Sequence, residues 1–304
     1  MSLLSEMERQ YSNSNVIPNM GEDKYDEDTG ITYYVETRDA AKPDLICYSI
    51  VMDAFANSRL PEAGIVSYRL LGALESKYKG GDFSMKPNTR IYTAVIQSLI
   101  HSEFIGNFND CEDAQTHQWI NNAQVAMYIL SKMKSNSVYP NAFTYNYIIN
   151  CAAECKCNEL AEARVSFEVA VRAFQEIRSL SKSEDGQSDT CPDSFTYAFM
   201  LKACSNHLPQ GSALRTKTLT HTFQECCRAG YLNSVVLDRL YIGVASDKEF
   251  SELTGITPAS SLHRRQDFSL DLCELPPSWS RNIITAKYPA SNDVKRRKRV
   301  ELYK

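Results

Sequence analysis

Apolar residues recur through the middle of the chain with the spacing of one helix face. Four stretches follow an i, i+3, i+4, i+7 pattern, which is typical of a helix that buries one side. They are Tyr48/Val51/Met52/Phe55, Tyr92/Val95/Ile96/Leu99, Tyr145/Ile148/Ile149/Ala152 and Tyr197/Met200/Leu201/Cys204. The residue six positions after each Tyr is small, as expected where a neighbouring helix approaches closely: Ala54, Ser98, Cys151 and Ala203.

The four stretches also share a polar beginning. Each Tyr lies five residues after a Pro, and the residue that follows the Pro is Asp44, Asn88, Asn141 or Asp193. A side-chain oxygen at such a position can accept a hydrogen bond from the free N–H groups of the first helical turn. We therefore predict that these four residues are N-caps and that a helix begins directly after each.

A second amphipathic segment follows each of these helices, starting near Pro61, Ala123, Glu159 and Ser212. Polar inserts at 79–85, 106–118 and 181–189 account for the uneven spacing of 44, 53 and 52 residues between the Tyr. Repeated helix pairs predict an all-α fold, an α-solenoid of about four repeats. The stripe Leu237/Leu240/Tyr241/Val244 lacks the Pro and predicts a capping helix.

These patterns divide the chain into three parts. Residues 42–245 form the predicted solenoid. Residues 1–41 are an acidic and mostly irregular leader, with one helix expected near Leu3–Tyr11. Residues 246–304 are a C-terminal extension with a basic tail, in which the sequence assigns no role to 275–282.

Composition favours a globular protein over a disordered one. The chain has 304 residues, of which 43% are hydrophobic and 23% charged, enough to bury a sizeable core. No run of 18 apolar residues occurs, and two early Glu disfavour a secretory signal, so no membrane span is expected. Without such a signal, the ten Cys are predicted to be reduced thiols.

Candidate chemical motifs are weak. Cys151, Cys155 and Cys157 lie close in sequence, but no second ligand pair at zinc spacing follows them, which favours buried small residues over a metal site. His101-Ser102-Glu103 matches half of a zinc deaminase signature, and no Pro-Cys-x-x-Cys completes it. We predict no catalysis, no metal and no cofactor.

Charge is distributed unevenly. Residues 281–304 hold eight Lys or Arg against Asp293 and Glu301, a net of +6, which leaves −10 for residues 1–280 because the total is −4. The basic cluster is "KRRKR", Lys295–Arg299, and the acidic extreme is "EDKYDED", Glu22–Asp28. For both segments, a solvated tail is the preferred interpretation, and a binding site is the second.

The repeated stretches resemble the pentatricopeptide-repeat family. "YPNAFTYNYIINCA" (139–152), "CPDSFTYAFMLKAC" (191–204), "KPDLICYSIVMDAF" (42–55) and "KPNTRIYTAVIQSL" (86–99) match the family's Thr-Tyr-Asn-like opening and Lys-Pro-Asp closing. The resemblance covers about residues 42–245 and is closest to the P-type repeat, with long inter-repeat insertions. Tetratricopeptide repeats share the helix pairs but lack the Pro-Asp/Asn opening.

The resemblance implies single-stranded RNA binding, with one base read per repeat. The implied readers are the outward-facing residue after each Tyr and the residue after the next Pro. They pair as Ser49 with Asn88, Thr93 with Asn141, Asn146 with Asp193, and weakly Ala198 with Asn233. Residues implied to pack on the bases are Ile46, Arg90, Phe143 and Phe195. In the family's code the first three pairs imply adenine, adenine and uracil.

A second function stays open. At the position where the family commonly carries a phosphate-binding Lys, this chain has Asn57, His101, Glu154 and Asn206. Three stacked bases give roughly 3–9 kcal/mol, against an association cost of about 4–15 kcal/mol, so RNA binding by four units alone is expected to be weak. The alternative is a protein-interaction scaffold whose concave surface holds a peptide or helix.

The expected roles follow from these two readings. The first is a non-catalytic RNA-binding adaptor in RNA processing, stability or translation, with a protein partner or the basic tail adding affinity. Family resemblance implies a mitochondrion or plastid, although no presequence is visible, and Lys295–Arg299 suggests the nucleus as the alternative.

Overall fold

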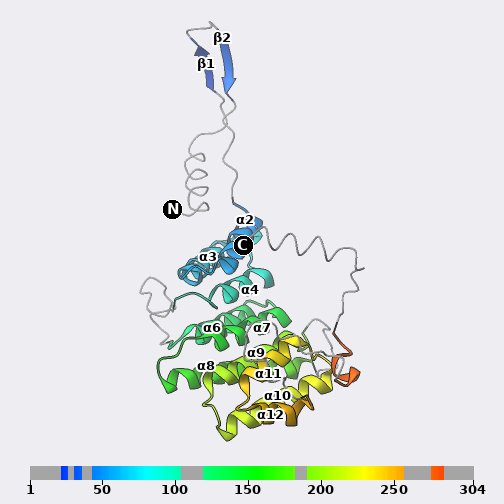
Figure 1. Cartoon of the computed structure of the whole chain (residues 1–304). Helices are drawn as coiled ribbons and strands as arrows, with labels where there is room; N and C mark the ends of the chain where they lie inside the picture. Colours follow the sequence, from blue (N-terminus) through cyan, green and yellow to red (C-terminus); the bar gives the residue numbers. More distant parts are fainter. Residues whose placement is uncertain are drawn as a thin grey trace. The chain divides into compact units, whose positions relative to one another are not determined.

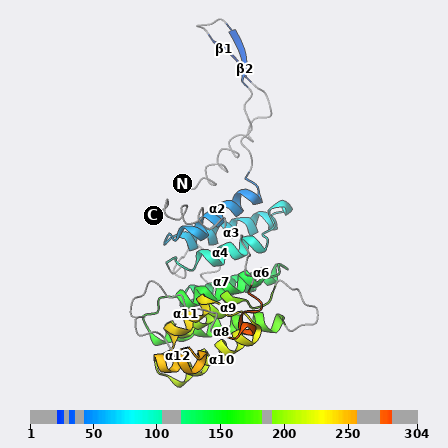
Figure 2. The same ribbon diagram turned by 45° about the vertical axis from the view of Figure 1, so that its right-hand side comes forward.

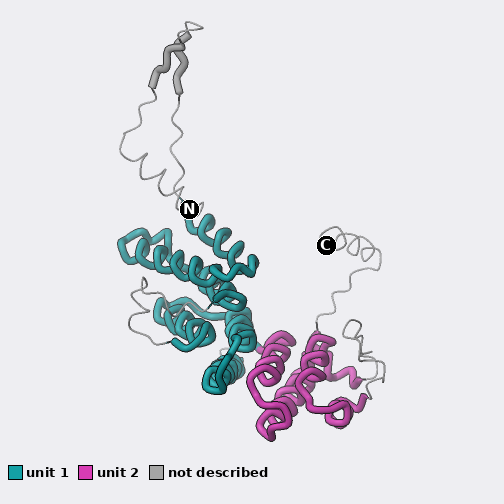
Figure 3. The backbone as a smooth tube through the Cα atoms, turned by 60° about the vertical axis from the view of Figure 1, so that its left-hand side comes forward, with its two compact units in different colours: residues 1–191 teal, residues 192–304 magenta. Residues whose placement is uncertain are grey.

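The computed structural model describes residues 22–26, 31–35, 43–103, 119–181, 190–256 and 275–283. The chain separates into two compact units, residues 1–191 and 192–304 (Figure 3). Each unit is described by itself. The sequence had predicted one solenoid over 42–245, so the division within it is a feature that the repeat pattern did not indicate.

The described residues of the first unit form three helix pairs. They are α2 (Leu45–Ser58) with α3 (Ala63–Lys79), α4 (Thr89–Ser98) with α6 (Asn122–Ser135), and α7 (Ala142–Glu154) with α8 (Leu160–Leu180). A short 3-10 turn, η1 (Phe83–Met85), follows α3. Helices α2, α3 and α4 pack side by side, and α4 also packs against α6 and α7, as both views show (Figures 1 and 2).

The second unit repeats this arrangement. Helix α9 (Ser194–His207) pairs with α10 (Ala213–Ala229), and α11 (Ser234–Gly243) packs against α9, followed by α12 (Asp247–Thr254) (Figure 1). Leu237 and Leu240 of α11 are fully buried, as the predicted capping helix requires. The helix pairs of the two units confirm the prediction of an all-α repeat fold.

The signature Tyr form the centre of the core. Tyr48, Tyr92, Tyr145 and Tyr197 are all buried. Their burial explains the stripes, because the residues three, four and seven positions on lie on the same helix face. Cys151, Cys204, Cys226 and Cys227 are buried thiols as well, so they serve as small core residues.

The four predicted caps are confirmed. The Oδ1 atoms accept backbone N–H bonds at 2.8 Å (Asp44 from Cys47), 3.1 Å (Asn88 from Ile91), 3.1 Å (Asn141 from Thr144) and 2.9 Å (Asp193 from Thr196). At α7 and α9 the Thr hydroxyl completes a capping box. The Pro-Asp/Asn motif therefore sets where each first helix begins.

One segment of the leader differs from the sequence prediction. The leader contains an antiparallel hairpin, β1 (Glu22–Asp26) with β2 (Ile31–Val35), in which Glu22 pairs with Val35 and Asp26 with Ile31. Ile31–Val35 has the β-branched and aromatic residues typical of strands. The helix expected near Leu3–Tyr11 and the basic cluster Lys295–Arg299 lie outside the described residues.

The unassigned segment at 275–282 closes the end of α10. Its 3-10 turn η3 (Pro277–Ser280) packs on α10, with the Trp279 ring 5.8 Å from Phe223 in an edge-to-face contact. Backbone hydrogen bonds join Leu232 N to Trp279 O (2.8 Å) and Asn282 N to Gly230 O (2.9 Å). The predicted C-terminal extension thus contributes α12 and η3 to the second unit.

Candidate RNA-binding surface

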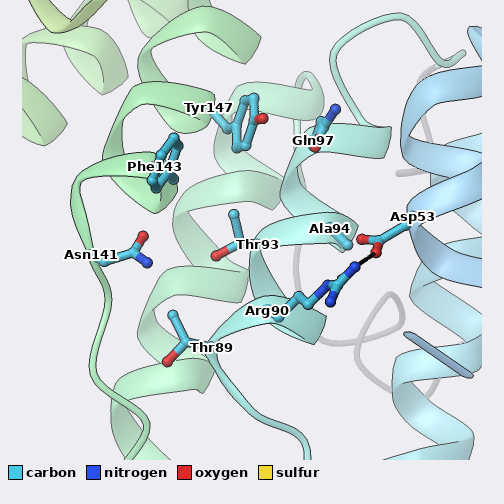
Figure 4. A pocket seen from close by; sticks show the side chains of 9 residues that line it. All are labelled: Asp53, Thr89, Arg90, Thr93, Ala94, Gln97, Asn141, Phe143 and Tyr147. Carbon is cyan, nitrogen blue, oxygen red and sulfur yellow. Dashed lines mark hydrogen bonds and ion pairs between the residues drawn. The ribbon is translucent and has the colours of Figure 1, made fainter. Parts of the chain in front are cut away.

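Four of the predicted RNA-binding residues line one pocket of the first unit. This pocket, here called the α4 pocket, has a volume of about 390 Å³ and runs along α4 between α2 and α7. It contains Arg90 and Thr93 from α4 together with Asn141 and Phe143 from the start of α7 (Figure 4). The structure therefore brings together one implied reading pair and both packing residues of adjacent repeats.

A chain of hydrogen bonds joins the two members of that pair. The Thr93 and Thr144 hydroxyl oxygens are 2.9 Å apart, and the Thr144 hydroxyl donates to Asn141 Oδ1 at 3.1 Å. Asn141 Oδ1 thus accepts from both the N–H and the O–H of Thr144. Because Oδ1 serves the helix cap, the Nδ2 group is the donor that Asn141 can offer to a ligand.

The implied packing residues protrude from their helices. Ile46, Phe143 and Phe195 have exposed fractions of 66%, 64% and 54%, and Arg90 is exposed too. The flat rings of Phe143 and Phe195 and the planar guanidinium of Arg90 suit base stacking. Each lies in the first turn of its helix, at the same position relative to the signature Tyr.

The residues directly after the Tyr do not face outward, so that part of the prediction is wrong. Ser49, Thr93, Asn146 and Ala198 are only 9%, 9%, 4% and 1% exposed. The reason is visible at Thr93, which meets the first turn of the next repeat through Thr144. The position after the Tyr therefore packs against the neighbouring helix instead of projecting into solvent.

The sequence prediction missed five further residues of the α4 pocket: Asp53, Thr89, Ala94, Gln97 and Tyr147. Asp53 and Gln97 stand five residues after Tyr48 and Tyr92, so a repeat-wise comparison of that position would have found them. Tyr147 stands two residues after Tyr145. Burial raises the pKa of the Tyr147 phenol, and the nearby Asp53 carboxylate raises it further.

Charge in the α4 pocket is balanced. The Arg90 guanidinium points to Asp53, and Nε lies 3.0 Å from Oδ2 (Figure 4). The Arg90 side chain remains 70% exposed and the Asp53 side chain 31%. This ion pair fixes the plane of the guanidinium at the edge of the pocket rather than adding a net positive charge.

The remaining candidates are distributed over both units. Ser49 lies on α2 and Asn88 caps α4, while Ala198 lies on α9 and Asn233 caps α11 by accepting from Val236 N at 2.9 Å. Asn146 belongs to the first unit and Asp193 to the second. Each cap is thus a structural residue first, and base reading at these positions stays a prediction.

Neither a metal cluster nor a candidate membrane-spanning helix occurs among the described residues. Among them, no group of three or more His, Cys, Asp or Glu is arranged to hold a metal ion. None of the described helices is long and apolar enough to span a bilayer.

The family assignment rests on the span that contains α6 and α7. A sequence profile of the family described as Pentatricopeptide repeat domain matches residues 118–154. The chain carries a pentatricopeptide repeat. This match confirms the family resemblance and joins the second helix of one predicted unit to the first helix of the next. The comparison with curated proteins gave no match.

Proposed function

We propose that this pentatricopeptide-repeat protein binds single-stranded RNA and that the α4 pocket holds one base. The observation that carries the proposal is the convergence of Arg90, Thr93, Asn141 and Phe143 on that pocket. A base entering it would be flanked by the Phe143 ring and the Arg90 guanidinium. Its edge would meet the Thr93 hydroxyl and the Asn141 amide.

The chemistry of the pocket favours adenine. Asn141 offers Nδ2 donors, because its Oδ1 is engaged by Thr144. Adenine and cytosine both present a ring-nitrogen acceptor beside an amino group on the pairing edge, whereas guanine and uracil present N–H groups there. The larger ring of adenine offers more surface to Phe143, which favours it over cytosine. The Thr93 hydroxyl can then accept from the adenine amino group. This agrees with the base implied by the family's code.

The wider role follows the same proposal. Pentatricopeptide-repeat proteins are generally adaptors without catalysis, so we place this chain in RNA processing, stability or translation. An organelle is the proposed compartment, with the nucleus as the alternative. Because the base contacts are few, a protein partner or the basic tail is proposed to supply added affinity.

The direct test is binding of fluorescent oligonucleotides, A10, U10, C10 and G10, to the full chain at low salt. We expect A10 to bind best, and Phe143→Ala to weaken A10 binding about fivefold or more, since one stacked base contributes about 1–3 kcal/mol. Phe83→Ala is the matched control, because Phe83 is also strongly exposed and lies outside the pocket.

The scaffold function would replace RNA binding if parent and variants failed to bind any of the four oligonucleotides at low salt. Equal binding by the parent and Phe143→Ala would remove the α4 pocket from the proposal. Circular dichroism of each variant establishes that the helices remain folded.

A further inference from the structure

Two cysteines lie on one face at the end of α7, in the first unit. Cys151 is in the last turn and is 1% exposed, and Cys155 is the C-cap residue four positions later. The Cys155 N–H donates to Cys151 O at 3.1 Å, so the helical spacing extends to Cys155. Residues four apart on a helix have Cα atoms on the order of 6 Å apart, within the range that a disulfide spans.

Only one of these two thiols is accessible. Cys155 lines a pocket of about 540 Å³, together with Asn121 and Asn122 at the beginning of α6 and the segment that follows α4. Cys151 is not part of that lining and is enclosed by the helix core. A small oxidant can therefore meet Cys155 first and Cys151 only through it.

The surroundings of Cys155 stabilise a thiolate. The hydrogen bond from the Cys151 thiol lowers the pKa of Cys155, burial opposes this effect, and the N–H groups of Ala123 and Asn122 lower the pKa further. Those N–H groups belong to the first turn of α6, a helix of 14 residues, where the helix dipole favours negative charge. The side chains of Arg59 and Lys156, both cationic at neutral pH, also line this pocket.

Several other titratable groups surround Cys155. His101, Glu103 and Glu154 also line the pocket. Cys151 keeps its proton, because the bond to Cys155 and burial raise its pKa well above the usual range. Cys157 lies nearby, with its sulfur 3.4 Å from Ser166 Oγ and in contact with the Cys155 carbonyl oxygen, and the Ser166 hydroxyl also bonds Cys155 and lowers its pKa.

We propose that Cys155 and Cys151 form a peroxide-sensitive dithiol, in which Cys155 reacts with the oxidant and Cys151 closes a disulfide. The Cys155 thiolate attacks one peroxide oxygen, the O–O bond breaks, and hydroxide leaves, giving Cys155 sulfenic acid. Cys151 sulfur then attacks the Cys155 sulfur, the S–O bond breaks, and the hydroxyl leaves with the Cys151 proton as water. Two thiols are oxidised and one peroxide is reduced.

The test treats the full chain with a slight excess of hydrogen peroxide and maps the thiols by differential alkylation and peptide mass spectrometry. We expect a peptide bearing Cys151 and Cys155 that lacks two hydrogen atoms and recovers on reduction. Cys155 should react about threefold or more faster than Cys47, a half-buried thiol of α2, because thiolate content governs the rate. This measurement needs no variant.

Two variants separate the roles. Cys151→Ala should leave Cys155 as a sulfenic acid that dimedone traps, and Ala is a tolerated residue at the matching buried position Ala203. Cys155→Ser should abolish oxidation of Cys151, while Cys47→Ser should change neither. A disulfide to Cys157, oxidation of Cys155 no faster than of Cys47, or no gain of dimedone adduct in Cys151→Ala would each overturn the proposal.

Discussion

At the scale of single residues, Asn141 combines two tasks in one side chain. Its Oδ1 holds the first turn of α7 through Thr144, and its Nδ2 is left to offer donors to the α4 pocket. The cap is needed whether or not a ligand binds. Because the two tasks use different atoms, a substitution can alter one and spare the other.

Asn141→Asp makes that separation. The Asp Oδ1 still accepts from Thr144, so the free energy of unfolding should change by less than about 0.5 kcal/mol, since Asn and Asp are equivalent caps. The donor becomes an acceptor, and preference for A10 over G10 should fall by about fivefold, the equivalent of one hydrogen bond. Parallel urea unfolding and oligonucleotide titrations measure both. A large loss of stability with unchanged base preference would assign Asn141 to the cap alone.

The sequence predicted the roles that depend on neighbouring residues and missed those that depend on residues far apart in the chain. The caps Asp44 and Asn88 were predictable, because a cap depends on three neighbouring residues and on nothing distant. The pair Arg90 and Asp53 was not, because it joins positions 37 apart on two helices. The burial of Thr93 was also missed, since it depends on where Thr144 of the next repeat packs.

At the scale of elements, a buried polar cluster joins three helices of the first unit. Glu75 of α3 accepts from Tyr92 of α4 at 2.8 Å and pairs with Lys132 of α6 at 2.7 Å. Asn136, the C-cap of α6, donates to the Tyr92 hydroxyl at 2.7 Å. The Glu75 side chain is 6% exposed, so it depends on these partners. The repeats are thus joined by specific bonds as well as by apolar packing.

Removing the carboxylate should be costly. Glu75→Ala leaves Lys132 and Tyr92 without their buried partner and is expected to lower the free energy of unfolding by about 3 kcal/mol. Glu168→Ala is the matched control, because its pair with Arg164 on α8 is exposed and should contribute less than about 1 kcal/mol. Chemical unfolding followed by circular dichroism gives both values. Equal effects of the two changes would contradict the role of the cluster.

The signature Tyr also predict how stability responds to alkaline pH. Burial raises the pKa of Tyr145 from 10.0 to about 12, and its hydroxyl donates to Glu176 at 3.1 Å. Between these two values the unfolded chain loses a proton that the folded chain keeps, so stability falls as pH rises. Tyr145→Phe should therefore flatten the decline between pH 10 and 12, as urea unfolding at several pH values would show. An unchanged slope would mean that Tyr145 titrates alike in both states.

The β1–β2 hairpin was not predicted from the sequence, because the composition of the leader pointed to an irregular segment. Ile31–Val35 alternates poorly, and its β-branched and aromatic residues follow the acidic stretch Glu22–Asp28, which was interpreted as a solvated leader. A strand is stabilised by the residues of the strand that pairs with it, so its own sequence carries only part of the signal that predicts it. Helix pairs, by contrast, carry their periodicity within each segment.

At the scale of the whole molecule, charge sets the limit on RNA affinity. Residues 1–280 carry −10 and residues 281–304 carry +6. Affinity for a polyanion normally comes in large part from cations that release counterions from phosphates. The family's Lys position is filled by Asn57, His101, Glu154 and Asn206. The helical repeats alone therefore offer little electrostatic attraction for an RNA backbone.

We expect the basic cluster Lys295–Arg299 to supply that attraction. If its five cations meet phosphates, the logarithm of the binding constant should fall with the logarithm of salt at a slope of about −3.5, because each single-strand phosphate contributes about −0.7. Replacing the five residues by Gln should bring the slope near zero and weaken A10 and U10 equally. Phe143→Ala should instead keep the slope and lose base preference. Titrations from low to moderate salt distinguish the two variants, and a slope that survives the Gln replacement would place the phosphate contacts on the repeats themselves.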